Sequence, residues 1–144
     1  MTDDGELHLH DVRENLQRQT FMRLLGAGAL EISAGRVVIE LPYREDLCQQ
    51  NGFLHAGAVT SIADSACGYA ALTLMPRGSD VLSVEFKVNL LAPAAGERFR
   101  ATATVVRPGR TLIVCTAEVT ALTEGRPDVV VALMQATMIA RGPR

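Results

Sequence analysis

The chain has 144 residues, of which 48% are hydrophobic and 21% charged, and this balance excludes a largely disordered protein. Its 14 basic and 16 acidic side chains give a formal net charge of −2, which excludes binding of nucleic acid through a basic surface. Aromatic residues make up only 4% and tryptophan is absent, so a surface that stacks on bases is excluded as well. We expect one domain over residues 1–144 that acts on a small molecule.

The N-terminal segment is acidic, unlike a secretory or mitochondrial leader. Three cysteines stand at no metal-ligand spacing, and reduced thiols are typical of the cytoplasm, so we expect a cytoplasmic protein without a metal. Residues 1–10 are expected to form a flexible tail. Apolar residues at helical spacing then predict a helix over 11–25, which Gly26 ends.

Two short apolar runs, 29–33 and 37–41, flank a glycine-containing turn and predict a β-hairpin. Residues 56–75 are mostly alanine, glycine, serine, threonine and aliphatic side chains, with Asp64 as the one charge. They predict a helix of about 30 Å that is apolar all round and lies in the middle of the protein. A membrane span is disfavoured, because an unpaired aspartate near its midpoint is costly in a bilayer.

After residue 78 the apolar residues recur at every second position, which is the period of a β-strand. Residues 83–90 alternate so that one face packs on the core and Ser83 lies on the opposite face; the core face consists of Val84, Phe86, Val88 and Leu90.

Three more strands are predicted at 98–106, 111–122 and 129–140, and short turns connect them. Strands joined in this way are antiparallel, so we expect the last four strands to form a meander. The long helix is the only element apolar enough to cover such a sheet. The expected fold class is α+β, an antiparallel sheet wrapped around a long central helix.

Few side chains are suited to catalysis, because the sequence lacks a nucleophile elbow, a phosphate-binding glycine loop and a zinc-type cysteine pair. His55 precedes the long helix, whose first N–H groups suit a developing oxyanion; the alternative is that His55 only caps the helix. Asp64 within the helix is a candidate general base; the alternative is that it only bonds a neighbouring hydroxyl, Thr60 or Ser61.

His55 and Asp64 are nine residues apart, which gives about 13–14 Å of helical rise and places them on opposite sides of the helix. They cannot act on one small group within one chain. If both are catalytic, the second comes from another copy of the protein. This predicts a homodimer with shared sites, or a homotetramer built from two such dimers.

Residues 49–58, followed by Asp64, resemble the signature of hotdog-fold acyl-CoA thioesterases of the phenylacetic-acid-degradation (PaaI-like) and thioesterase superfamily member 2 group. The family pattern is Asn or Gln, six residues later His-Gly-Gly, and nine residues after the His an Asp or Glu. Gln49, His55 and Asp64 stand at these positions. The resemblance implies hydrolysis of an aryl-acyl or medium-chain acyl-CoA to free acid and CoA, without a cofactor.

The resemblance also implies roles for individual residues. Asp64 would act as base or nucleophile, the amide N–H of Ala56 with Gln49 would polarise the carbonyl, and His55 would orient the loop or the thioester. Ala56 replaces the family's first glycine, whereas Gly57 keeps the second.

Ser83 matches a family serine that helps to hold the attacking water, although the alternation of its strand requires a partner subunit to cover it. The resemblance also places the nucleotide of CoA near the loop at 92–95 and near the turn that contains Arg107, Gly109, Arg110 and Thr111, with the two arginines as candidate phosphate contacts. The alternative is that both arginines are only solvated turn residues.

Two other functions share this scaffold. A non-catalytic acyl-CoA-binding protein would leave Asp64 unexplained. A hotdog enoyl-CoA hydratase or dehydratase would carry His-rich and Asp-x-Asn-type motifs, which the sequence lacks.

Overall fold

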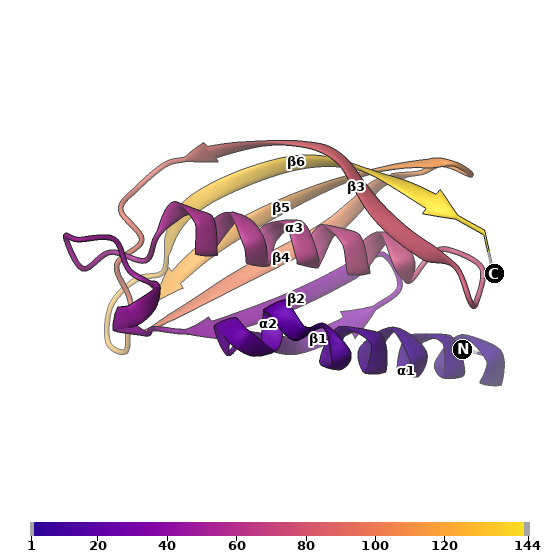
Figure 1. The fold of residues 1–144 in the computed structure, drawn as a ribbon, viewed down its shortest axis with the longest axis horizontal. Coiled ribbons are helices and arrows are strands. Elements are labelled where there is room, and N and C mark those ends of the chain that lie inside the picture. The colour runs from indigo at the N-terminus through magenta and orange to yellow at the C-terminus, as the bar shows by residue number, and fades with distance from the viewer. Residues whose placement is uncertain (1, 143–144) are drawn as a thin grey trace.

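The computed structural model describes residues 2–142, in which one antiparallel sheet curls around a long helix (Figure 1). The helices are α1 (Asp3–Arg18), α2 (Thr20–Leu25) and α3 (Ala56–Leu72), and a short 3-10 turn, η1, spans Glu45–Leu47. The strands are β1 (Gly28–Ser33), β2 (Arg36–Pro42), β3 (Asp80–Leu90), β4 (Arg98–Pro108), β5 (Leu112–Leu122) and β6 (Val129–Arg141). The predicted α+β class and its central helix are confirmed.

The prediction of a flexible tail over residues 1–10 is wrong, because the chain is helical from Asp3 onward. Thr2 caps this helix by accepting a hydrogen bond from the N–H of Gly5, and the acidic first turn complements the positive end of the helix. His8 ties the helix to the end of α3, since its Nε2 lies 3.0 Å from the carbonyl oxygen of Leu72. The helix was predicted to start later because its buried apolar residues begin only in the third turn.

Helix α3 packs small side chains against the sheet. Its buried face is dominated by alanine, and the strands below it also present alanines at inward positions, such as Ala101, Ala103, Ala117 and Ala136. Small residues on both sides let the helix backbone approach the sheet closely.

The opposite side of α3 is not buried, so a helix apolar all round was the wrong expectation. This half-buried side, which we call the stripe, runs from the start of the helix to Gly68 at helical spacing. It consists of Ala56, Gly57, Thr60, Ser61, Asp64, Ser65 and Gly68. Among residues 2–142, no helix is long and apolar enough to cross a membrane.

The strand order is β1-β2-β4-β5-β6-β3, which corrects the expected four-strand meander. The β4–β5–β6 part is as predicted, but β3 pairs with β6, and β4 pairs with β2 instead. The reason is that α3 crosses the face of the sheet, so the chain re-enters at the far edge (Figure 1). Residues 91–97 then return to the middle of the sheet past the start of α3, where the N–H of Leu54 donates to the carbonyl of Ala94 at 3.0 Å.

A β-bulge reverses the expected orientation of Ser83. The register between β3 and β6 shifts between Ser83 and Glu85. Ser83 therefore pairs with Met138 and Phe86 pairs with Ala136, and both of these partners are buried under α3. The extra residue shifts the phase of alternation, so Ser83 and Phe86 share the inward face.

Candidate functional site

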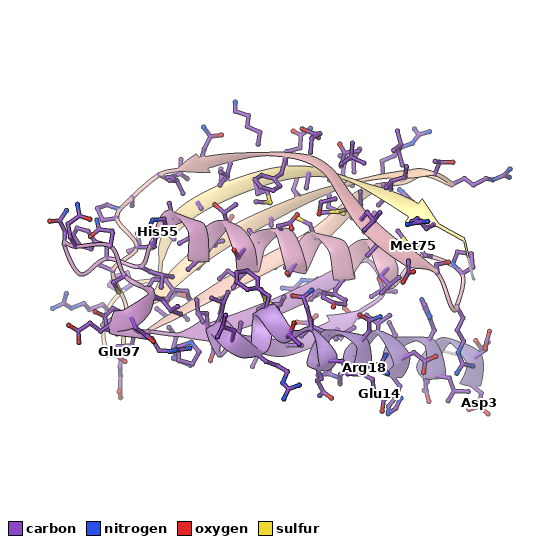
Figure 2. All side chains as sticks on the ribbon, viewed as in Figure 1. Asp3, Glu14, Arg18, His55, Met75 and Glu97 are labelled. Atoms are coloured by element: carbon purple, nitrogen blue, oxygen red, sulfur yellow. The ribbon has the colours of Figure 1, made fainter. Side chains whose placement is uncertain are left out.

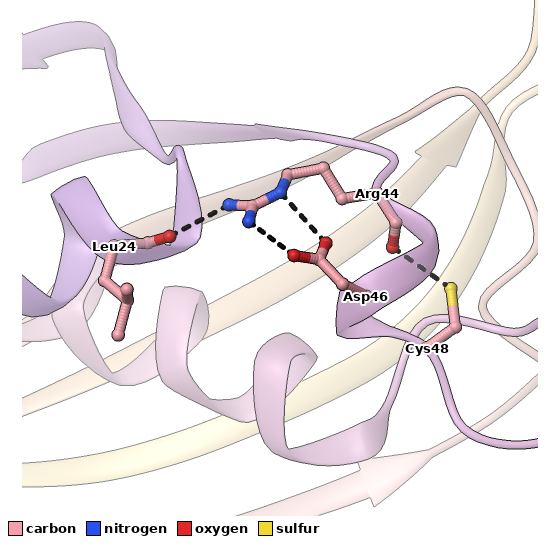
Figure 3. A network of polar contacts seen from close by, with 4 residues as sticks. All are labelled: Leu24, Arg44, Asp46 and Cys48. Atoms are coloured by element: carbon pink, nitrogen blue, oxygen red, sulfur yellow. Dashed lines mark hydrogen bonds and ion pairs between the residues drawn. The ribbon is translucent and has the colours of Figure 1, made fainter.

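The loop between β2 and α3 is held in place by Arg44. Its guanidinium donates to both carboxylate oxygens of Asp46, at 3.1 and 2.7 Å, and to the carbonyl oxygen of Leu24 at 2.9 Å (Figure 3). The thiol of Cys48 donates to the carbonyl of Arg44 at 3.3 Å. These contacts tie the loop to the end of α2. The candidate residues Gln49 and His55 follow Cys48 in the same loop.

His55 is the N-cap of α3, as its structural alternative predicted. Its Nδ1 accepts a hydrogen bond from the N–H of Gly57 at 2.7 Å. A Cβ atom at residue 57 would lie 2.9 Å from this nitrogen, so the cap requires glycine there. The N–H of the residue between them, Ala56, has no hydrogen-bond partner within the part of the chain described. It remains an available donor at the positive end of the helix.

Gln49 and Ala56 line one hollow of about 440 Å³, which we call the apolar hollow. Its other walls are Phe53, Leu54, Val59, Leu90, Leu91, Ala92, Pro93, Ala94 and Val131. The side-chain oxygen of Gln49 accepts from the N–H of Asn51, which leaves the NH2 group as the free part of that amide. Two N–H donors in apolar surroundings suit an oxygen that develops negative charge.

Asp64 and Ser83 meet within one chain. The hydroxyl of Ser83 donates to Oδ1 of Asp64 at 2.7 Å, and it lies 3.4 Å from the sulfur of Met138. The expectation that a partner subunit must cover Ser83 is therefore corrected, because the bulge turns this side chain toward α3. The alternative that Asp64 bonds a hydroxyl of its own helix is wrong, because its hydroxyl partner is Ser83 of β3. The hydroxyl of Ser61 instead donates to the carbonyl of Gly57 at 2.7 Å.

A second hollow, of about 360 Å³, extends from Asp64 and Ser83 to the junction of α1 and α2; we call it the polar hollow. Tyr69 donates to Oδ1 of Asn15 at 3.1 Å and accepts from Nε2 of Gln19 at 3.2 Å. Burial raises the pKa of Tyr69, while the hydrogen bond from Gln19 partly offsets it, so the hydroxyl keeps its proton at neutral pH.

Two polar residues at the end of α1 and at its junction with α2 were missed by the sequence reasoning. Asn15 and Gln19 are separated from Tyr69 by 54 and 50 positions along the chain. No spacing rule connects positions so far apart, and a polar residue on a helix is normally solvated.

Cys67 is a core residue, as predicted. It is fully buried, and the hydrogen bond with Cys115 together with burial raises the pKa of its thiol. It is therefore protonated at neutral pH and unsuited to attack a substrate.

The structure brings the site residues together in two pairs. Gln49 with Ala56 lines the apolar hollow and Asp64 with Ser83 lines the polar hollow, while His55 faces a third hollow beside Phe21. In Figure 2, His55 lies at the start of α3 and Arg18, which lines the polar hollow, at the end of α1. The two pairs therefore line different hollows in one chain, and the sharing of a site between two copies stays a prediction.

The turn between β4 and β5 exposes two cations. Arg107 and Arg110 are exposed and form no ion pair with any described residue. Gly109 allows the chain to turn, since a Cβ there would lie 2.0 Å from the carbonyl oxygen of Leu112. Thr111 is anchored by its carbonyl, which accepts from the N–H of Ala140 at 2.8 Å.

The chain is similar to several known proteins. Residues 51–127 match the thioesterase superfamily. A thioesterase family protein from Silicibacter pomeroyi is 50% identical, with a TM-score of 0.89 over 92% of this chain and 97% of that one. Acyl-coenzyme A thioesterase 13 from Homo sapiens is 28% identical over 80% of this chain and 83% of its own length. A protein named as an esterase in Saccharolobus solfataricus is 35% identical over 64% of this chain and 65% of its own length, so the chain spans just under two thirds of that relative.

Proposed function

The chain belongs to the thioesterase superfamily, a family of thioester hydrolases with the hotdog fold, and from this premise we propose that it hydrolyses an acyl-CoA to the free acid and CoA. The observation that carries the proposal is the division of the chain into two half-sites. One half-site offers the N–H groups of Ala56 and Gln49, and the other offers the carboxylate of Asp64 with the hydroxyl of Ser83.

We propose that two copies complete each site through β3. This strand of 11 residues forms one edge of the sheet and pairs only with β6 among the described residues. Its exposed apolar side chains are Leu82, Val84, Phe86 and Leu90, at 51, 53, 44 and 55% exposure. An open, apolar edge strand is a template for pairing with another chain, and two-fold symmetry makes the same edge serve both copies.

A two-fold axis through the middle of β3 turns the partner's α3 end for end. The start of that helix then lies beside the Asp64 half of this chain's helix. In this arrangement Ala56 of the partner subunit reaches the thioester that Asp64 acts on. A homotetramer would be formed by two such dimers.

The reaction follows from these positions. The carbonyl oxygen of the thioester accepts hydrogen bonds from the N–H of Ala56 and the amide of Gln49, which stabilise the negative charge that develops there. Ser83 holds a water molecule, Asp64 takes its proton, and the resulting hydroxide attacks the carbonyl carbon. The carbon–sulfur bond breaks, and the CoA thiolate takes up the proton that Asp64 accepted, so the products are acid and CoA and the carboxylate is regenerated. No cofactor is needed, because the carboxylate activates the water.

Direct attack by Asp64 is the alternative route, through a mixed anhydride. A single turnover in ¹⁸O-water with enzyme in excess tests this route, because label in Asp64 arises only from water attack on the mixed anhydride.

The turn after β4 is our proposed site for the nucleotide of CoA. Arg107 and Arg110 are available cations for its phosphates, and Gly109 and Thr111 shape the turn. We further propose a cytoplasmic location, which fits the three unpaired cysteines.

An assay over phenylacetyl-, benzoyl- and medium-chain acyl-CoAs, with release of free thiol as the readout, tests the proposal. Release of CoA from at least one of them is expected. Binding without turnover would identify a non-catalytic acyl-CoA-binding protein, and hydration of an enoyl-CoA would identify a hydratase.

Oligomeric state is tested by sedimentation of active protein at micromolar concentration. We expect a dimer or a tetramer, and Val84→Lys on the open edge should shift the population toward inactive monomer. An active, stable monomer would refute the shared site.

A further inference from the structure

We infer that Glu85 and Lys87 set the register in which two copies pair through β3, and that this register places Phe86 on the two-fold axis. The register rests on the dimer of the proposed function and adds to it the partner residue that each charge meets. It follows from the free backbone groups of β3, from two charges without an ion pair, and from the distance between the half-sites.

The open edge of β3 presents the backbone groups of alternate residues. Just beyond the strand, the N–H of Leu91 donates to the carbonyl of Val131 at 2.8 Å, so the backbone groups of Leu91 point toward the chain of β6. The direction alternates along an antiparallel strand, and Phe86, Val88 and Leu90 therefore point theirs toward the open edge. A second copy bonds through these residues only if the axis passes through a residue position and not between two.

Two opposite charges flank Phe86 on the outer face of β3. Glu85 pairs with Thr137 of β6, whose hydroxyl donates to Oε1 of Glu85 at 2.6 Å and holds the carboxylate in place. Lys87, the only lysine of the sequence, pairs with exposed Gln135. Both charges face away from α3, because their partners on β6 alternate with buried residues. Both are exposed and form no ion pair within residues 2–142.

One position of the axis satisfies both charges. With the axis at Phe86, Glu85 lies opposite Lys87 of the partner subunit, and the symmetry makes the same pair a second time. These are non-hydrogen-bonded pairs, in which opposed side chains come closest, so opposite charges stabilise the dimer and like charges destabilise it. An axis one residue earlier would oppose two copies of Glu85, and an axis one residue later would oppose two copies of Lys87.

The position of α3 leads independently to the same residue. A site shared by Ala56 of one copy and Asp64 of the other needs the axis midway between them, at Thr60, which is four residues or about 6 Å from Asp64. Asp64 binds Ser83, and β3 runs opposite to α3, so the axis crosses β3 beyond Ser83 (Figure 1). The bulge adds one residue without adding a strand step, so two steps of about 3.4 Å lead from Ser83 to Phe86.

The register thereby controls whether the half-sites meet. Moving the axis by one residue slides the partner by two residues, which is about 7 Å. Such a shift takes the N–H of Ala56 in one copy away from Asp64 in the other. The alternative role of charges on an edge strand is protection against aggregation, and that role requires no particular partner residue.

Cysteine cross-linking locates the axis. A residue on the axis faces its own copy at about 5.5 Å between Cα atoms, within reach of a disulfide. Phe86→Cys should therefore form a covalent dimer on oxidation, seen on a non-reducing denaturing gel. Val88→Cys is the matched control, because its two copies lie about 14 Å apart in this register. The parent protein, whose three cysteines are unpaired, is the blank. A cross-link in Val88→Cys and none in Phe86→Cys would overturn the inference.

Charge reversal tests whether the two charges choose this register. Glu85→Lys and Lys87→Glu, each combined with Phe86→Cys and a tag of different size, are co-expressed and oxidised. Each variant opposes like charges in its own dimer, whereas the mixed dimer opposes unlike charges at both positions. If each like-charged dimer is weakened by about 10-fold, about nine-tenths of the covalent dimer should be mixed, against about one half for random assortment. The double variant with both reversals in one chain should assemble as the parent does.

Glu124→Lys with Arg126→Glu is the matched control, because both residues are exposed on the turn between β5 and β6. The same charges are reversed there, and the covalent dimers should assort at random. Random assortment of the β3 variants as well would show that the charges only protect the edge, and the inference would be wrong. Rescue in the double variant separates a like-charge contact from a merely misfolded strand.

None of these readouts uses a substrate, so the two proposals fail separately. Selective pairing by a protein that hydrolyses no CoA thioester would leave the register standing and refute the proposed function. Turnover by a dimer that assorts at random would do the reverse. A parent protein that sediments as a monomer would refute both the shared site and the register.

Discussion

The two sides of α3 differ in the physical requirement that their side chains meet: one side packs on the sheet, and the other carries the polar groups of the candidate site. The side against the sheet is fully buried and consists of alanines and aliphatic side chains such as Ala63, Ala66 and Ile62, which are selected by volume. The stripe carries the polar atoms, including the free N–H of Ala56 and the carboxylate of Asp64. One helix thus separates stability from chemistry, and substitutions on its two sides should change different measurements.

The largest effect on activity is expected from the stripe. Asp64→Asn keeps the size of the side chain but removes the group that takes the proton or attacks, so kcat should fall by about 10²–10⁴ while acyl-CoA binding persists. Asp128→Asn, on an exposed turn, is the control for loss of a carboxylate. Near-normal kcat in folded Asp64→Asn protein would place the chemistry elsewhere.

Ala56→Pro tests the other half-site. Proline fits the first position of a helix, and the N–H it removes has no internal partner, so the fold should persist. The loss of one oxyanion donor should lower kcat by about 10²–10³. Ala56→Gly keeps the donor and should keep kcat/KM. Parent-level turnover by the assembled proline variant would contradict this role.

On the packed side, Ala63→Leu should act on stability alone. The residue is 0% exposed between helix and sheet, and three added carbon atoms have no space there. We expect the free energy of unfolding to fall by about 1–3 kcal/mol in urea denaturation. Ser61→Ala, on the stripe, is the comparison and should change it by less than about 0.5 kcal/mol. Equal losses at the two positions would show that the two sides are not distinct.

Gly57→Ala should break the cap of α3. The new Cβ would approach Nδ1 of His55 to 2.9 Å, so the ring must move and its hydrogen bond is lost. Loss of an N-cap lowers stability by about 1 kcal/mol, and turnover should fall with the displaced loop. Thermal denaturation of this variant beside Ala56→Gly separates a lost cap from a merely altered helix start.

The smallest effect, and one of opposite sign, is expected for Gly68→Ala. The nearest atom to its Cβ would be a methyl of Val81 at 4.0 Å, so the methyl group fits. Alanine is the better helix former, and stability should rise by about 0.5–1 kcal/mol in the same denaturation experiment. A loss of stability at this position would mean that the stripe is packed more tightly than it is in one chain.

Local pattern was enough to predict the elements of this protein. The hairpin, the long helix and the last three strands were placed to within a few residues, because helical and strand periods are properties of neighbouring positions. The spacing of Gln49, His55 and Asp64 also led to the candidate site and its two half-sites, whose roles stay predictions. The start of α1 was wrong, since its polar first turns are held by a cap and by His8, not by an apolar stripe.

Sequence by itself thus determined which segments are helix or strand, and which residue types near α3 are suited to thioester chemistry. Only the tertiary structure decided that β3 pairs with β6, that a bulge turns Ser83 onto Asp64, and that Asn15 and Gln19 reach Tyr69. The physical reason is that a strand partner, a register shift or a hydrogen bond across 50 residues is chosen by packing of the whole sheet around the helix. The periodicity of apolar residues within one segment does not depend on these long-range contacts and so cannot predict them.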